Sequence, residues 1–190
     1  MLHIPSNSNN IGTIIGIDPG TTFVGIGFIN INLINNKIIS SDALTINGSK
    51  LYYNEFDIIV HGERYNRISC IEKYLIDFFI CKNPFIVCAE SPFFGLRHPN
   101  AFQALTEVIC SIRKAVSIYN QSQNLYLVPP SNVKQLISLK GNSDKIVMKE
   151  KILNMDFLNY NGIIQMKDLD EHSIDALSVA YYAYNQFINN

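Results

Sequence analysis

The order of the apolar runs constrains the fold of this chain more than any other feature of its sequence. Three runs rich in β-branched residues stand about a turn apart near the beginning, at Ile11–Asp18, Phe23–Ile29 and Lys37–Ile46. Pro19-Gly20 follows the first run and Asn35-Asn36 precedes the third, and both pairs are typical of turns. The spacing therefore predicts a three-stranded antiparallel meander.

Helical and extended segments alternate in the rest of the chain. Two compact apolar runs, Phe85–Ala89 and Leu125–Val128, are typical of buried strands between helices. Asn47–His61 is interpreted as an irregular insertion with at most one short strand. Apolar periodicity and capping residues predict helices over residues 63–79, 100–117, 131–136, 143–153 and 171–187. This order predicts an α/β domain with a mixed five-stranded sheet, antiparallel at one edge and parallel beyond it.

Composition fits one soluble globular domain. The 190 residues are 47% hydrophobic and only 16% charged, which excludes intrinsic disorder, collagen-like structure and a coiled coil. We interpret residues 1–12 as a polar tail and residues 13–188 as a single domain. The net charge of −1 does not mark a strongly basic nucleic-acid binder, although clustered acids can mask a basic face.

The four cysteines form no CxxC pair, so a zinc site or redox motif is not expected. Cys88 and Cys110 lie within apolar runs and are predicted to be buried thiols. The beginning of the chain lacks a secretory pattern, and no window approaches about 18 uninterrupted apolar residues. We therefore expect a soluble, intracellular protein with free thiols.

Four polar side chains fall at the ends of predicted elements. Asp18 closes the first strand and Glu90 the fourth, while His172 and Asp175 begin the last helix on one face. Reactive groups of open α/β sheets gather at the carboxyl ends of strands, and converging carboxylates repel one another unless cations lie between them. Oxygen ligands suit Mg²⁺ or Mn²⁺, and two such ions are the usual machinery of phosphodiester cleavage.

Each of these positions also has a structural interpretation. Asp18 before Pro-Gly can form a turn, and Glu90 before Ser-Pro can be an ordinary loop acid. Asp170 and Glu171 can favour the helix N-terminus through the macrodipole. That explanation does not extend to Asp175, which lies among apolar residues, so the combination favours a site.

Four motifs in unbroken order resemble the RuvC-type Holliday-junction resolvases. Residues 15–22 (IGIDPGTT) are similar to the first-strand motif of that family, and Glu90–Phe93 (ESPF) to the second. Lys134 and Lys145, eleven residues apart, match the spacing of two junction-contacting lysines, and His172–Leu177 (HSIDAL) resembles the final motif. The resemblance covers roughly residues 13 to 185.

The resemblance implies a ribonuclease H-like fold and a Mg²⁺-dependent endonuclease that uses two ions per active site, with Mn²⁺ as a substitute. It also implies a homodimer that nicks opposed strands of four-way DNA junctions, and it leaves open whether other branched DNA is cut. The expected location is the cytoplasm, a DNA-containing organelle or a virus-infected cell. By position, the implied metal-binding catalytic residues are Asp18, Glu90, His172 and Asp175, and the implied DNA-binding residues are Lys134, Lys145 and Phe93.

The chain departs from the family pattern at two places. Family members carry small residues in the middle of the helix on which they pack as dimers, whereas this chain has Thr106–Cys110 there. The segment Asn47–His61 is longer than a compact member needs. Both departures bear on which branched DNA is cut, and viral and organellar relatives vary in these ways.

Other functions stay open at this level. Residues 16–22 also resemble the phosphate-binding hairpin of actin-like ATPases and kinases, although such proteins need about twice this length and a second phosphate loop. A single-strand nuclease of the same fold is a further alternative, although the spacing of Lys134 and Lys145 favours the resolvase. A junction-binding scaffold without activity is not favoured, because all four expected ligand positions hold residues that can bind a metal. The lysines at 149 and 151 are interpreted as a solvated helix face.

Overall fold

The computed structural model describes residues 10–51, 55–92, 99–138 and 145–188, and a mixed sheet runs through its centre. Its strands, in chain order, are β1 (Ile11–Asp18), β2 (Phe23–Asn32), β3 (Ile38–Asn47), β4 (Ile86–Glu90) and β5 (Leu125–Val128). They lie side by side in the order β3-β2-β1-β4-β5. The β1–β2 and β2–β3 pairs are antiparallel, and the β1–β4 and β4–β5 pairs are parallel. The prediction of a mixed five-stranded sheet is confirmed.

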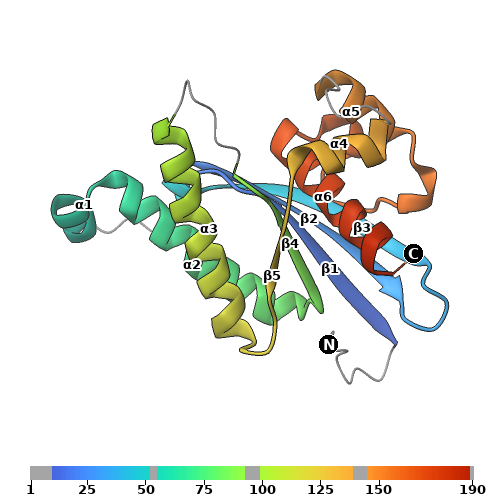
Figure 1. Ribbon diagram of the computed structural model, residues 1–190, viewed down its shortest axis with the longest axis horizontal. Coiled ribbons are helices and arrows are strands. Elements are labelled where there is room, and N and C mark those ends of the chain that lie inside the picture. The colour runs from blue at the N-terminus through green and yellow to red at the C-terminus, as the bar shows by residue number, and fades with distance from the viewer. Residues whose placement is uncertain (1–9, 52–54, 93–98, 139–144, 189–190) are drawn as a thin grey trace.

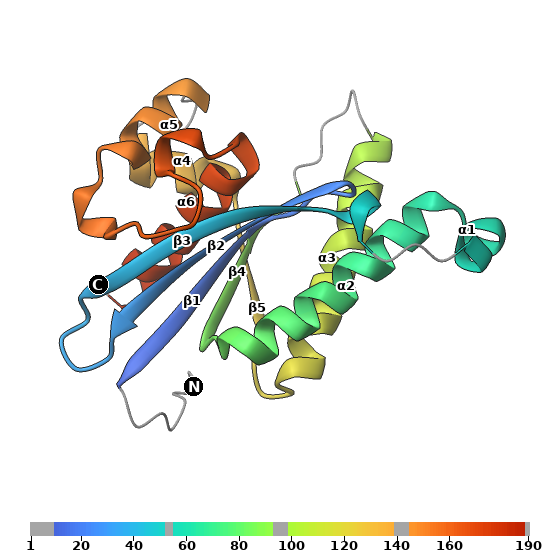
Figure 2. The same ribbon diagram turned by 180° about the vertical axis from the view of Figure 1, so that it is seen from behind.

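Helices cover both faces of this sheet (Figures 1 and 2). The helices are α1 (Glu55–His61), α2 (Glu63–Lys82), α3 (Pro99–Tyr119), α4 (Pro130–Ser138), α5 (Lys145–Leu153) and α6 (Glu171–Phe187). One face carries α2 and α3, and the other carries α4, α5 and α6. The short helix α1 projects beyond the N-terminal end of α2. The described part of the chain contains no helix that is long and apolar enough to cross a membrane.

Strand alternation decides which side chains meet which layer. Ile15 and Ile17 of β1 belong to the buried cluster beneath α2 and α3, whereas Ile14 belongs to the cluster on the α6 side. β4 alternates in the same way. Because successive side chains of a strand point to opposite faces, Asp18 and Glu90, the last residues of their strands, both fall on the α6 side.

Glycines in the first motif let α6 lie directly on the sheet. A Cβ atom at Gly16 would collide with the backbone of Ala176 and Ala180, and one at Gly25 would collide with the carbonyl of His172. Only glycine leaves room for such a close approach of two backbones. This packing brings the beginning of α6 against the carboxyl end of β1, and it explains the glycines of the motif in physical terms.

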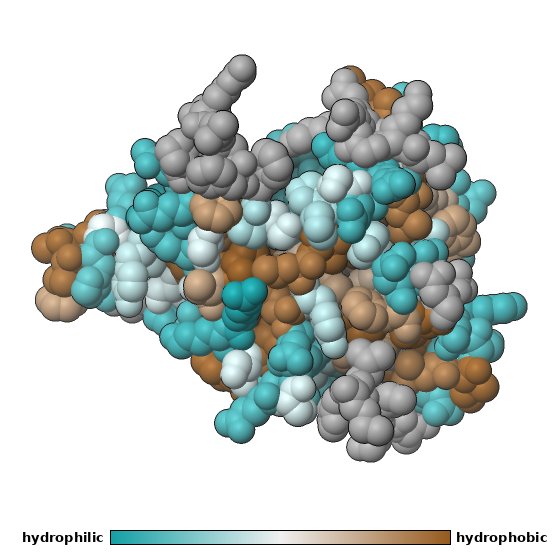
Figure 3. Space-filling model, in the orientation of Figure 1, coloured by the Kyte–Doolittle hydropathy of each residue, from teal (hydrophilic) through white to brown (hydrophobic). Residues whose placement is uncertain are grey.

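The insertion at Asn47–His61 differs from its prediction. Asn47 is the last residue of β3, and the described residues after it form a 3₁₀-helix at Gly48–Lys50 and the helix α1. Phe56, Ile59 and Val60 recur at helical spacing, a signal that the sequence interpretation overlooked. All three side chains are exposed, and α1 forms an apolar edge of the molecule (Figure 3).

Of the two cysteines predicted to be buried, one is buried and the other is exposed. Cys88 is fully buried in β4, as expected, and burial raises its pKa to about 12. Cys110 is exposed, because it lines an open hollow between α2 and α3, whereas its neighbours Val108, Ile109 and Ile112 face the core. An apolar run within a helix does not specify the side on which one residue falls.

Candidate active site

One pocket of about 270 Å³ lies at the carboxyl ends of β1 and β4, beneath α4, α5 and α6. Its lining includes Asp18, Glu90, Lys134, His172 and Asp175, five of the seven residues singled out from the sequence. Phe93 lies outside the described residues. Lys145 is the first residue of α5, and its side chain is not among those described.

The sheet register brings the first two acids together. Ile17 and Ala89 are partners in the parallel β1–β4 pair, so the next residues, Asp18 and Glu90, end their strands side by side. Both carboxyl groups belong to half-buried residues. Two acids at adjacent strand ends on one face of a sheet form the floor of the pocket, and neither needs to be a turn residue for this placement.

The beginning of α6 is fastened to the sheet by a capping network. Asp170 is the N-cap residue, and its Oδ1 accepts hydrogen bonds from the Ser173 backbone N–H at 2.8 Å and from the Thr45 hydroxyl at 2.7 Å. Partial burial raises the pKa of Asp170, but these hydrogen bonds outweigh it and hold the pKa below its usual value. Asp170 is therefore a true cap and not only a charge near the helix dipole.

His172 is hydrogen-bonded to Asp18 across the pocket. The distance from Nδ1 of the imidazole to Oδ2 of the carboxylate is 2.7 Å. This hydrogen bond raises the pKa of His172, partial burial lowers it, and the charges of Asp18, Glu171 and Asp170 add to the increase. The pKa of the imidazole therefore lies above its ordinary value, because the neighbouring carboxylate stabilises the charged form of the ring.

An aromatic ring covers one face of that imidazole. Phe23, the first residue of β2, stacks on His172 with a centroid separation of 5.8 Å and an interplanar angle of 17°. The Asp18 hydrogen bond holds one edge of the imidazole, and the phenyl ring lies against its plane. His172 is thus held in one orientation by two residues of the first motif region.

Two lysines come from the helices above the sheet. Lys134 of α4 is half-buried in the pocket lining, next to Val133, which anchors the helix in the core. Lys149 of α5 donates from Nζ to the Leu169 carbonyl at 2.7 Å, just before α6. The solvated-face interpretation of Lys149 is therefore wrong, because its ammonium ties α5 to the segment that leads into the site. Lys151 is exposed, as expected.

The donor set of the pocket fits a divalent cation. Three carboxylates and one imidazole supply the hard oxygen and borderline nitrogen ligands that Mg²⁺ and Mn²⁺ take. Among the described residues, no group of three or more His, Cys, Asp or Glu side chains is already arranged as a metal centre. Asp18 is engaged with His172, so a cation at this carboxylate would replace the imidazole as the charge that offsets it.

Solved structures of other proteins share this architecture. Thermus thermophilus RuvC superimposes with a TM-score of 0.66 at 18% identity, over 91% of this chain and 94% of that one. The chain has the fold of the RuvC resolvases. The yeast mitochondrial Holliday junction resolvase follows with a TM-score of 0.56 at 13% identity, over 94% and 81% of the two chains. Fowlpox virus resolvase gives 0.51 at 17% identity, over 93% and 99%.

Comparison by sequence finds no match for this chain, although comparison by structure does. No protein-family model and no curated protein matches this chain. The RuvC fold therefore persists here at a sequence identity too low for whole-chain sequence comparison, while short motifs at strand and helix ends stay recognisable.

Several residues of the site were missed by sequence reasoning. Phe23 was assigned only to a strand, and Thr45 and Ser173 were given no role. Their side-chain partners are distant in the chain, and no local pattern marks these contacts: Thr45 lies 125 residues from Asp170 and 128 residues from Ser173. In a RuvC fold they become neighbours only when α6 docks on β2 and β3.

Proposed function

We propose that this protein is a divalent-cation-dependent endonuclease that cuts branched DNA, with the four-way junction as its main substrate. The observation that carries the proposal is the convergence of Asp18, Glu90, Asp175, His172 and Lys134 on one pocket. The RuvC fold supports it, because Thermus thermophilus RuvC and fowlpox virus resolvase have been solved with Holliday junction DNA. An open pocket of this kind accepts a backbone phosphate between its acids and its lysine.

In this proposal each side chain has a distinct task. Asp18, Glu90 and Asp175 hold two Mg²⁺ ions, with His172 as the fourth ligand, and these ions supply the activation of water and the neutralisation of the leaving oxygen. Lys134 places its ammonium beside the phosphate and stabilises the charge that develops there. Lys145 and Phe93 are proposed to contact phosphate and opened bases, respectively.

The test compares DNA shapes and cations in one gel assay. Synthetic four-way, Y-shaped and linear duplexes of matched sequence are incubated with Mg²⁺, Mn²⁺, Ca²⁺ or EDTA. We expect four-way junctions to be cut with Mg²⁺ or Mn²⁺ and to be bound without cutting in Ca²⁺, because the looser coordination of Ca²⁺ misplaces the attacking water. Robust cutting in excess EDTA contradicts the proposal. Preference for unpaired strands favours a single-strand nuclease, and ATP hydrolysis without cutting favours the actin-like alternative.

A second prediction concerns Lys134. Lys134→Ala should flatten the slope of log affinity against log salt by about one unit, because one phosphate contact is lost. The single-turnover rate at saturating protein should fall roughly tenfold, because the ammonium stabilises developing charge. Lys151→Ala, an exposed lysine of α5, is the matched control and should change neither quantity. Equal behaviour of the two variants would show that Lys134 is only a solvated lysine.

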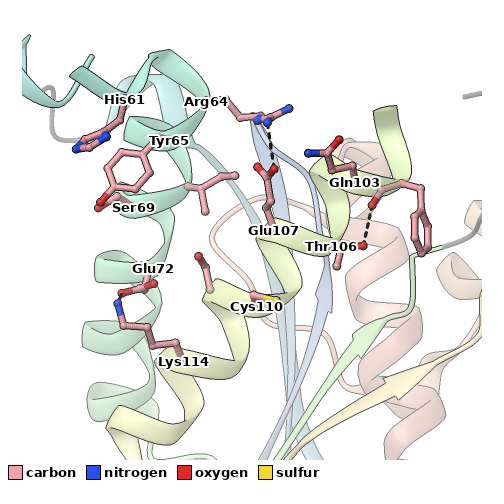
Figure 4. A pocket seen from close by; sticks show the side chains of 13 residues that line it. His61, Arg64, Tyr65, Ser69, Glu72, Gln103, Thr106, Glu107, Cys110 and Lys114 are labelled. Carbon is pink, nitrogen blue, oxygen red and sulfur yellow. Dashed lines mark hydrogen bonds and ion pairs between the residues drawn. The ribbon is translucent and has the colours of Figure 1, made fainter. Parts of the chain in front are cut away.

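We also propose that two copies act together, since a four-way junction presents two opposed strands for paired nicks. A hollow of about 850 Å³ lies between α2 and α3, on the face of the sheet away from the catalytic pocket (Figure 4). Two ion pairs cross it, Arg64–Glu107 at 3.0 Å and Glu72–Lys114 at 2.7 Å. Because these charges are already paired, a second copy can cover this face without leaving them uncompensated.

Two exposed cysteines allow a direct test of this arrangement. Cys110 lines the α2–α3 hollow, whereas Cys81 lies near the end of α2 and does not line it. As protein concentration rises through dimer formation, we expect Cys110 to react more slowly with a thiol reagent and Cys81 to react at a constant rate. Cys81→Ser and Cys110→Ser separate the two signals, and sedimentation gives the mass. Unchanged Cys110 reactivity in a proven dimer places the interface elsewhere.

A further inference from the structure

Phe23 is a residue of the site to which the proposed function gives no task. It is exposed over 43% of its surface and belongs to neither buried cluster of the described residues. Its ring nevertheless lies almost parallel to the imidazole of His172, with an interplanar angle of 17°. An exposed phenyl ring beside a polar pocket contributes little to the core, and the ring contact that it makes is the stack on His172.

The backbone just before Phe23 is held by hydrogen bonds from two other parts of the chain. The Thr22 carbonyl accepts a hydrogen bond from the Gly48 N–H at 2.7 Å, and the Thr21 carbonyl accepts one from Arg67 Nε at 3.2 Å. Phe23 itself pairs with Asn47 of β3. The turn between β1 and β2 is thus tied to α2 and to the end of β3, and it presents the phenyl ring from a rigid support.

The imidazole needs such a support, because one hydrogen bond does not fix a ring. The bond from His172 Nδ1 to Asp18 fixes a point at the edge of the ring and leaves the ring free to tilt about it. A flat partner at 5.8 Å between centroids removes that tilt. Rotation by half a turn about the Cβ–Cγ bond exchanges the ring edges but keeps the plane, so the stack is compatible with either nitrogen facing the pocket.

We propose that Phe23 is a positioning residue, which keeps the imidazole of His172 in the plane that presents a ring nitrogen to Asp18 or to a divalent cation bound there. The inference rests on the proposed function for the cation, and it assigns a role outside the four expected ligands. Residues that orient a metal ligand typically contribute 10–100-fold to metal affinity or activity, so loss of the stack is expected to matter although Phe23 touches no reacting atom.

The test uses the full chain and two substitutions of opposite kind. Phe23→Leu keeps an apolar side chain but loses the flat face, and Phe23→Tyr keeps the face. We expect Phe23→Leu to weaken Mn²⁺ binding about tenfold, measured by electron paramagnetic resonance without DNA, and to raise in parallel the Mg²⁺ concentration for half-maximal junction cutting. Junction affinity in Ca²⁺ should stay within about twofold, because the DNA contacts are untouched. Phe23→Tyr should match the original protein in every measurement.

A second readout does not depend on cutting. The ring protons of His172, assigned by comparison with His172→Asn, should lose their ring-current shift in Phe23→Leu and keep it in Phe23→Tyr. Phe23→Ile, a β-branched residue suited to a strand, replaces Phe23→Leu if that variant melts early. Weaker junction binding at unchanged Mn²⁺ affinity would make Phe23 a DNA contact and overturn the proposal. The proposal also fails if Phe23→Leu and Phe23→Tyr give the same values as the original protein in every measurement. If the original protein cuts no junction while the Mn²⁺ and resonance effects persist, the nuclease function fails and the positioning role stands.

Discussion

Asp18→Asn is expected to lower single-turnover cutting of a four-way junction by at least about 10³-fold. The carboxylate ends β1 at the floor of the pocket, next to Glu90 and 2.7 Å from the His172 imidazole. Neutralising it removes a cation ligand while the shape of the side chain is kept. Junction affinity should stay equal or increase, most clearly without Mg²⁺, because one negative charge no longer repels the DNA backbone.

The experiment separates binding from chemistry. Each variant is titrated against a fixed junction at several salt concentrations, and cutting is then measured at saturating protein. Asp77→Asn, an exposed acid on α2, is the matched control and should bind and cut like the original protein. Cutting of the junction by Asp18→Asn at the original rate would mean that Asp18 only shapes the turn before Pro19, and the catalytic assignment would fall.

His172→Ala should reduce cutting about a hundredfold, and His172→Asp should retain a good part of the activity. Glu171 is the alternative to His172 as the fourth ligand, since it also lies one helical turn from Asp175. The structure distinguishes them: His172 lines the catalytic pocket and bonds to Asp18, whereas Glu171 is exposed and does not line it. An Asp at position 172 supplies the oxygen ligand that Mg²⁺ prefers.

The comparison variant is Glu171→Gln, which should cut at close to the original rate. Without cations, His172→Asp should also be less stable to heat than the original protein, because its carboxylate then faces Asp18 with no charge between them. Added Mg²⁺ should restore much of that stability by binding the folded state. Damage from Glu171→Gln together with a harmless His172→Ala would reassign the fourth ligand to Glu171.

The sequence by itself determined most elements of this fold and the identity of the pocket acids. β1, β5 and α6 begin and end where apolar periodicity and capping predict, because short-range pattern decides these elements. Asp18 and Glu90 stand out because they close apolar strands, and strand parity then sends both to one face. These are local properties, and the chain carries them before it folds.

Which side of a helix faces the core, and which distant residues meet, were decided only by the tertiary structure. Cys110 lies within an apolar run of α3, but it lines the open hollow between α2 and α3 and its side chain is exposed. Which side of an apolar helix faces the core depends on where the neighbouring layer lies. Local pattern therefore overestimated burial at Cys110.

The chemistry of the pocket belongs to the tertiary structure in the same sense. His172 and Asp18 are 154 residues apart in the chain, and their hydrogen bond forms because Gly16 and Gly25 let α6 approach the backbone of β1 and β2. The stack of Phe23 on His172 depends on that same approach. Sequence shows which side chains can bind a cation. Only the packing of a helix onto a sheet decides their distances, and with them the raised pKa of His172 and the support that its ring receives.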